Sequence, residues 1–242
     1  MFDSIPVLEG NIVKRSLQFF WIVDHSGSMT GQKIATLNQA IREAIPEVQK
    51  ALSTHPEVQI MMRAIKFADN VSWHVGPEAV PIEEFAWNEI DAGGCTATAS
   101  AINLLCDELE VEKMNKRGYP PICILLSDGY STDSDEDYDA AIKRLDSMPW
   151  GKKAVRLVIA IGNENDYDES ALLKFVNHKE IGVLKADNPG KLTQYIKWAS
   201  VAASIGASQS KSSGDPDKID DSTNVILISP EDIEISSAGD VF

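Results

Sequence analysis

Three oxygen-bearing side chains alternate along one short segment of the chain. Asp24, Ser26 and Ser28 occupy every second position of the pentapeptide DHSGS, in which Gly27 allows a turn. Carboxylate and hydroxyl oxygens are hard ligands that favour Mg²⁺, Mn²⁺ or Ca²⁺ over zinc. The pattern therefore predicts a site for a hard divalent cation, with Mg²⁺ expected first.

Two later loops carry side chains that can complete such a site. Asp128 follows the apolar run ICILLS at 122–127, and Thr96 ends the glycine-containing loop at 93–96. In open α/β sheets, ligands bind outside the carboxyl ends of the strands, so these loops can face one crevice. Two carboxylates there would repel each other unless a cation lay beside them. The predicted metal ligands are Asp24, Ser26, Ser28, Thr96 and Asp128.

The elements that must position these residues begin with a strand. The apolar run LQFFWIV at 17–23 is typical of a strand buried on both faces of a parallel sheet. Helical spacing of apolar residues follows over 31–52, where Pro46 predicts a kink or an early break. Residues 59–68 and 71–75 are predicted to form a hairpin, which implies an antiparallel edge strand.

Strands and helices keep alternating through the rest of the chain. The pattern predicts a helix at 97–114, a strand at 122–127, a helix at 135–147, a strand at 154–161, a helix at 169–176, a strand at 181–184 and a helix at 189–205. Such alternation indicates an α/β fold with three layers, in which helices cover both faces of a doubly wound, mostly parallel sheet. We expect about six strands, one of them an antiparallel edge strand.

The domain organisation follows from a change in composition near the end of the chain. Residues 17–205 form the predicted domain, and residues 1–16 are an N-terminal extension. Residues 206–242 are rich in Ser, Asp and Lys, which indicates an acidic linker and C-terminal tail. The apolar stretch NVILIS at 224–229 makes a docking peptide one reading of this tail, and a disordered tail the other.

Charge and composition exclude several classes of partner. Acidic residues outnumber basic ones 37 to 22, and the formal net charge of -15 repels nucleic acid and anionic membranes alike. We find neither a signal-peptide pattern nor an apolar run long enough to span a bilayer. Three cysteines without a C-x-x-C spacing favour reduced thiols over a disulfide framework. A cytoplasmic protein is therefore expected.

The three loops together resemble the metal-ion-dependent adhesion site of von Willebrand factor A domains. That site has the pattern D-x-S-x-S, then a Thr, then an Asp-Gly, and DHSGS, GCT at 94–96 and SDG at 127–129 match it in order. The resemblance covers roughly residues 15–205. The family's usual Gly-Gly-Thr is Gly-Cys-Thr here, with Gly93 before it, so Thr98 stands as the alternative to Thr96.

The resemblance implies a role for each predicted ligand. Ser26 and Ser28 would contact the metal directly, whereas Asp24, Thr96 and Asp128 would bind it directly or through water. It also implies an open coordination position, which a Glu or Asp of a protein partner completes. The chain's own tail is a second source of that carboxylate, and the candidates are Glu231, Asp232 and Glu234.

Within the family, the segments FFWIVDHSGSM and LLSDG are most similar to bacterial TerY-type proteins associated with tellurium resistance. This resemblance implies a non-catalytic interaction module in stress or defence signalling. It also implies a Ser/Thr protein kinase and a metal-dependent protein phosphatase as partners.

An enzymatic reading competes with the binding module. An Asp after a strand, with Mg²⁺, also serves aspartyl-phosphate chemistry, so a Mg²⁺-dependent phosphohydrolase is the alternative function. That chemistry generally wants a second acid two residues later, where this chain has Ser26. Nucleotide-binding glycine motifs are also missing from the sequence. We therefore expect no enzymatic activity.

Simpler structural roles are also open for the same residues. The DHSGS loop and Thr96 could cap helices, and Asp128 could be a turn residue before a glycine. His25 could be a surface residue or a contact at the rim of the site. A cluster of acids could form a second cation site or a solvated helix start, and its members are Asp133, Asp135, Glu136, Asp137 and Asp139.

Overall fold

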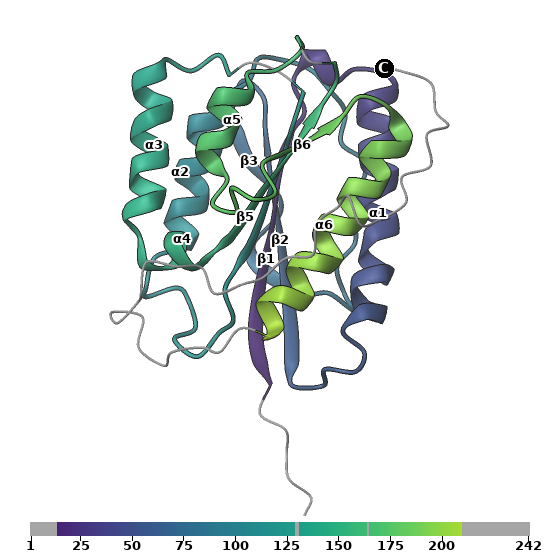
Figure 1. Cartoon of the computed structure of the whole chain (residues 1–242), viewed down its shortest axis with the longest axis vertical. Coiled ribbons are helices and arrows are strands. Elements are labelled where there is room, and N and C mark those ends of the chain that lie inside the picture. Colours follow the sequence, from purple (N-terminus) through teal and green to yellow (C-terminus); the bar gives the residue numbers. More distant parts are fainter. Residues whose placement is uncertain (1–13, 129–130, 164, 210–242) are drawn as a thin grey trace, which may run out of the picture.

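The computed structural model describes residues 14–128, 131–163 and 165–209. Their strands form one six-stranded sheet in the order β3-β2-β1-β4-β5-β6 (Figure 1). The strands are β1 (Arg15–Asp24), β2 (Val58–Phe67), β3 (Val71–Pro81), β4 (Ile122–Ser127), β5 (Val155–Ile161) and β6 (Val183–Ala186). All neighbouring pairs are parallel except β2 and β3, so β3 is an antiparallel edge strand.

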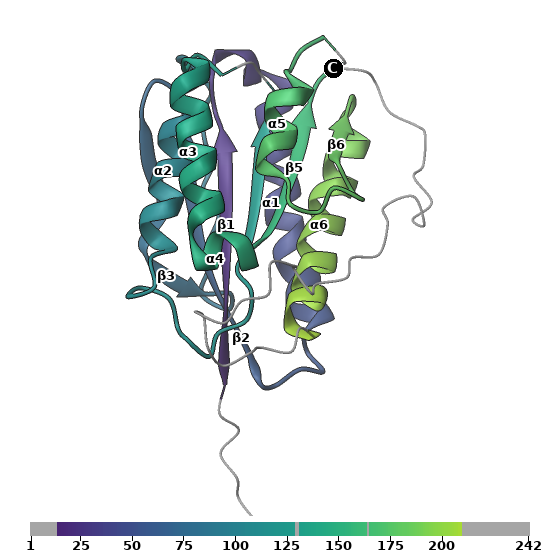
Figure 2. The ribbon, with the colours of Figure 1, turned by 60° about the vertical axis from the view of Figure 1, so that its left-hand side comes forward.

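Helices cover both faces of this sheet. They are η1 (Gly27–Met29), α1 (Gln32–Ala51), α2 (Thr98–Glu108), α3 (Asp135–Ser147), α4 (Pro149–Lys153), α5 (Glu169–Phe175) and α6 (Pro189–Gln209). Figures 1 and 2 show α1 and α6 on one face and α2, α3 and α5 on the other. The predicted three-layer, doubly wound α/β fold is confirmed.

The apolar run of β1 explains why this strand lies inside the sheet. Phe19 and Trp21 point into the core beneath α1 and α6, and Phe20 and Ile22 point into the core beneath α2 and α3. All four side chains are fully buried. Each face of a central parallel strand meets a helix layer, which is why the run does not alternate apolar with polar residues.

The order in which the chain adds strands to the sheet reverses between β1 and β4. From β1 the chain continues through α1 to β2 on one side, and from β4 it continues through α3 to β5 on the other. The two following helices lie on opposite faces. Loops at the carboxyl ends of such a strand pair separate and leave a crevice, which is where ligands bind in open α/β sheets.

Two helices differ from their predicted extents. The predicted break at Pro46 is absent, since α1 continues to Ala51 with Ala44, Ile45 and Val48 buried against the sheet. The helix predicted over 97–114 ends at Glu108, although Leu109 and Met114 stay buried and so continue the apolar period. Burial of its apolar face in the core keeps α1 helical through Pro46. After α2 ends, the apolar residues Leu109 and Met114 lie in turns and remain buried.

The edge strand also differs from its predicted length. β3 runs from Val71 to Pro81, so it continues beyond the predicted end at residue 75 and includes Pro77 and Pro81. The pairing of β3 with β2 has register shifts on both sides of Ala64. Proline is tolerated there because an edge strand needs hydrogen bonds along one side alone.

The ends of the predicted domain lie close to the ends of the described core. β1 begins at Arg15 and α6 reaches Gln209. Most of the N-terminal extension, and the tail with NVILIS and its three candidate carboxylates, lie outside the described residues. No helix in the described part of the chain is long and apolar enough to cross a membrane.

Candidate metal site

The first and last of the predicted ligands lie at the carboxyl ends of adjacent strands. Asp24 is the final residue of β1, and Asp128 directly follows the final residue of β4. Val23 and Leu126 are paired in the sheet, and the charge of Asp128 acts on Asp24, so the two aspartates lie near each other at the carboxyl ends of these strands. Both are buried, with 0% of Asp24 and 1% of Asp128 exposed.

Hydroxyl groups from the DHSGS loop connect these strand ends. Ser28 Oγ donates a hydrogen bond to Asp128 Oδ1 over 2.6 Å, across 100 residues of sequence. Ser26 Oγ lies 3.0 Å from Ser28 Oγ, and Ser26 is 2% exposed. The loop thus turns Ser28 toward the end of β4, with Ser26 beside it.

The Asp24 carboxylate is held from both sides. Its Oδ1 accepts the backbone N–H of Ser26 over 2.8 Å, and its Oδ2 accepts the hydroxyl of Ser127 over 2.6 Å. Burial raises the pKa of Asp24 to about 6, these hydrogen bonds lower it, and the nearby charge of Asp128 raises it. Ionising two buried neighbouring carboxylates is unfavourable, and a bound cation would relieve that cost. The donor set therefore fits a hard divalent cation.

One further charged group reaches this cluster. Lys33 Nζ lies 2.6 Å from Asp128 Oδ2. The side chain of Lys33 is 17% exposed and that of Asp128 is 0% exposed. Sequence reasoning missed this lysine because its helical position resembles that of any surface residue of α1.

Backbone contacts bring the loop containing Thr96 against the DHSGS loop. Gly27 N–H donates to Gly94 O over 2.9 Å, and Gly93 N–H donates to His25 O over 2.7 Å. Thr96 is buried two residues after Gly94. Thr98, the alternative, is the first residue of α2 and is buried as well. The three loops are therefore assembled at one place, and Thr96 lies close to the contacts that join them.

Gly94 is required by the shape of this loop. Its φ of 89° lies in the left-handed region that favours glycine. A Cβ atom at this position would come within 2.6 Å of Asp69 Oδ2. Asp69 is needed there because its Oδ1 accepts the backbone N–H of Cys95 over 2.7 Å.

A fourth segment, which sequence reasoning did not assign to the site, fixes Thr96 from the other side. Thr132 N–H donates to Thr96 O over 2.9 Å, and Thr96 N–H donates to Thr132 Oγ1 over 3.2 Å. Asp133 Oδ2 accepts the N–H of Ala99 over 2.7 Å, in the first turn of α2. The segment was hard to find because nothing in its sequence shows which loop it contacts.

The acidic cluster after β4 is divided among separate contacts. Asp133 binds the start of α2, Asp137 pairs with Ser134 at the start of α3, and Asp139 forms an ion pair with Lys174. Among the described residues, no group of three or more His, Cys, Asp and Glu side chains could hold a metal ion. The second cation site is therefore not formed in the described part of the chain, and the helix-start reading is confirmed for Asp135, Glu136 and Asp137.

The N-cap positions of α1 and α2 do not hold the predicted ligands. Gly31 precedes α1 and Ala97 precedes α2, and neither residue makes a side-chain cap hydrogen bond. Ser26 precedes η1, also without a side-chain cap. His25 is half-buried, and its Nδ1 lies 3.0 Å from Asp91 O, so its ring steadies the neighbouring loop.

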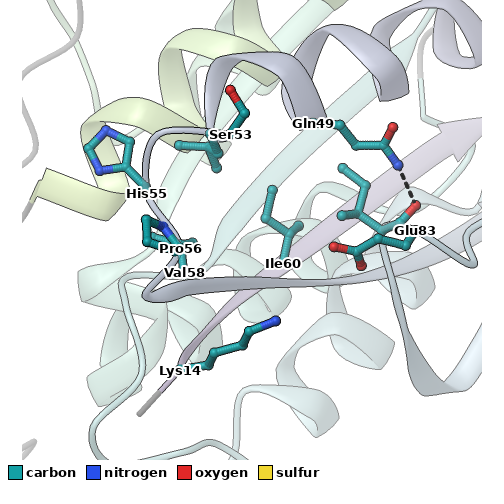
Figure 3. Close-up of a pocket in the computed structure, with 10 residues that line it drawn as sticks. Lys14, Gln49, Ser53, His55, Pro56, Val58, Ile60 and Glu83 are labelled. Carbon is teal, nitrogen blue, oxygen red and sulfur yellow. Dashed lines mark hydrogen bonds between the residues drawn. The ribbon is translucent and has the colours of Figure 1, made fainter. Parts of the chain in front are cut away.

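A cavity lies at the other end of the sheet, away from Asp24 and Asp128 (Figure 3). Its volume is about 470 Å³, and its lining includes Lys14, His55, Ile60 and Glu83. Lys14 precedes β1, whereas Asp24 ends it, so the whole strand separates this cavity from the aspartates.

Comparisons with known proteins agree with this arrangement. The von Willebrand factor type A domain model matches residues 20–197. A search of curated proteins finds no match. Among solved structures, the chain is similar to a von Willebrand factor type A protein from Catenulispora acidiphila, with 16% identity and a TM-score of 0.60 over 80% of this chain and 43% of that one.

Two other structures show the same fold. The ArnB paralog VWA2 from Sulfolobus acidocaldarius has 18% identity and a TM-score of 0.57 over 76% of this chain and 44% of that one. Proximal thread matrix protein 1 from the mussel byssus, with a zinc-occupied MIDAS motif, has 14% identity and a TM-score of 0.54, over 80% of this chain and 47% of that one. The chain thus spans less than half the length of these three proteins.

The family match covers most of the described core, from within β1 to within α6. The strand order and the site at the ends of β1 and β4 are consistent with it. This chain belongs to the von Willebrand factor type A domain family.

Proposed function

We propose that this protein is a non-catalytic interaction module, which binds an acidic side chain of a partner protein through a bound Mg²⁺. The observation that carries this proposal is the 2.6 Å hydrogen bond from Ser28 to Asp128. It joins the DHSGS loop to the end of β4, and the carboxylates of Asp24 and Asp128 are both buried there. Such a cluster of hard oxygens, at the crevice of an open α/β sheet, suits a divalent cation.

Each ligand has a role in this proposal. As the family resemblance implies, Ser26 and Ser28 would contact the metal directly, and Asp24, Thr96 and Asp128 would bind it directly or through water. Bound Mg²⁺ supplies the positive charge to which a partner's Glu or Asp is attracted. Mn²⁺ and Ca²⁺ suit the same hard donors, and the mussel protein carries zinc in its motif.

A binding role fits the residues better than phosphate transfer. von Willebrand factor A domains are generally interaction modules without catalytic activity. The position two residues after Asp24 holds Ser26, whose hydroxyl lies next to Ser28. This leaves the phosphohydrolase alternative without the second acid that it would use at that position.

The partners that we propose are a Ser/Thr protein kinase and a metal-dependent protein phosphatase in a bacterial stress or defence assembly. This rests on the similarity of FFWIVDHSGSM and LLSDG to TerY-type proteins, and it includes a cytoplasmic location. A kinase or phosphatase that offers a surface Glu or Asp could complete the metal's coordination.

The test is a pull-down with the whole chain, with Mg²⁺ and with chelator, together with calorimetric Mg²⁺ titration. Ser28→Ala removes a proposed ligand, and Thr30→Ala is its matched control. Thr30 is exposed in the same loop, and its hydroxyl binds Gly27 O. We expect chelator and Ser28→Ala to release the same partners, while Thr30→Ala retains them. Partners retained under every condition would show that the metal site is not the interface.

A further inference from the structure

Both oxygens of Asp128 are engaged by groups of this chain. Oδ1 accepts from Ser28 Oγ over 2.6 Å, and Oδ2 accepts from Lys33 Nζ, also over 2.6 Å. Lys33 therefore gives Asp128 a positively charged partner inside the site. Its ammonium group thus pairs with a carboxylate that would help to hold a bound cation.

The position of Lys33 in its helix is unfavourable for a lysine. Lys33 is the second residue of α1, and the first turn of this helix contains no acidic side chain. The N-terminus of a helix carries positive partial charge, which repels a cation. Contact with buried Asp128 offsets that repulsion, because both partners are largely removed from solvent. A residue that conflicts with its local setting in this way is often functional.

The charges at the site indicate how Lys33 would affect the binding of a metal ion. Asp24 and Asp128 bring two negative charges to the site, and Lys33 already compensates one of them. A divalent cation must then bind beside an ammonium group or displace it. The Lys33 side chain is 17% exposed, so a path to solvent is open to it.

We propose that Lys33 is an internal competitor for the divalent cation. In the metal-free protein its ammonium group occupies Asp128, and metal binding requires that group to leave the carboxylate. This inference rests on the proposed metal site, and it makes Lys33 one of the residues that set the affinity of that site for the cation. Lys33 therefore weakens metal binding.

The test compares Mg²⁺ affinity and thermal stability of the full-length wild type, Lys33→Met and Lys66→Met. Methionine keeps much of lysine's length without its charge. Lys66 is a matched control because its charge acts on His25 in the DHSGS loop, so it lies at the same end of the sheet. No contact between Lys66 and Asp128 is found in the part of the chain that the structure describes.

Opposite effects on affinity and stability are expected for Lys33→Met. Its Kd for Mg²⁺ should fall about tenfold, because methionine no longer places a positive charge against the carboxylate that the cation would use. In chelator, its Tm should fall by about 5 °C, because buried Asp128 loses its charged partner. Saturating Mg²⁺ should then raise its Tm more than it raises that of the wild type. Lys66→Met should change neither quantity appreciably.

Lys33→Gln provides a second variant if Lys33→Met does not fold, because glutamine can still donate a hydrogen bond to Asp128. An unchanged or weaker Kd in a folded Lys33 variant, with Mg²⁺ binding intact in the wild type, would overturn the competition alone. Absence of Mg²⁺ binding in all variants would overturn the metal site as well. Binding by the Lys33 variants but not by the wild type would support strong competition.

Discussion

Ser28 and Asp128 join the ends of β1 and β4 through a hydrogen bond of 2.6 Å. The bond connects the first proposed ligand loop to the third, although 100 residues separate them in sequence. A metal bound there would therefore depend on both strand ends at once.

Asp128→Asn should remove metal binding while the fold remains. Asparagine can keep the hydrogen bond with Ser28, but it removes the negative charge that attracts a cation. We expect the Kd for Mg²⁺ to rise by at least about 100-fold. Calorimetric titration measures this, and circular dichroism checks the fold.

Asp146→Asn is the control for this change. Asp146 forms an ion pair with Arg156 and is 51% exposed. Its replacement removes an equal charge while leaving the Mg²⁺ affinity as in the wild type. Equal loss of affinity in both variants would point to a general effect of net charge and not to a ligand at position 128.

Gly94→Ala should distort the loop that carries Thr96. Its φ of 89° disfavours a side chain, and the added Cβ would meet Asp69 at 2.6 Å. We expect a loss of stability of about 1–3 kcal/mol and a weaker affinity for Mg²⁺. Urea denaturation and metal titration measure the two effects.

Gly93→Ala is the neighbouring control. A Cβ at Gly93 would meet nothing within 4 Å. Stability and metal affinity should both stay close to the wild type. If the two alanine variants behaved alike, the conformation of Gly94 would not be what holds this loop in place.

Thr132→Val should weaken metal binding without removing a proposed ligand. Valine cannot accept the N–H of Thr96, which Thr132 Oγ1 accepts over 3.2 Å. Thr96 would then lose one of the contacts that fix its position. Because groups that orient ligands typically contribute about 10–100-fold to metal affinity, we expect a loss of about tenfold.

Ser134→Ala separates this effect from simple destabilisation. Ser134 accepts the N–H of Asp137 and so caps α3. Its loss should cost about 1 kcal/mol of stability and leave the Mg²⁺ affinity unchanged. A similar drop in affinity for Ser134→Ala would argue that Thr132 has no specific role in positioning Thr96.

Asn38→Ala should be among the most destabilising polar substitutions. The buried Asn38 side chain accepts from Trp87 Nε1 and from the N–H of Ile90, and donates to Ile90 O. Alanine would leave these buried groups without partners, at a cost of about 3 kcal/mol. The exposed neighbour Gln39→Ala should change stability by less than about 0.5 kcal/mol. Denaturant unfolding of both proteins decides the comparison.

Several features of this protein could be predicted from the sequence because they depend on local patterns. The run from Leu17 to Val23 is apolar at nearly every position, and such a run fits a strand with helices on both sides. The alternation of strands and helices then predicts the fold class. The DHSGS spacing also indicates the kind of ion that its oxygens suit, since ligand hardness is a property of residue type.

Tertiary structure decided which residues meet. Lys33 contacts Asp128 because α1 begins beside the end of β4, and Thr132 contacts Thr96 because the loop after β4 lies against the start of α2. Neither contact leaves a local pattern, because the partners lie far apart in sequence. The same holds for Pro46, since helix continuity there depends on buried neighbours and not on the proline alone. Sequence determined the chemistry available at the strand ends, and packing determined which charges share that space.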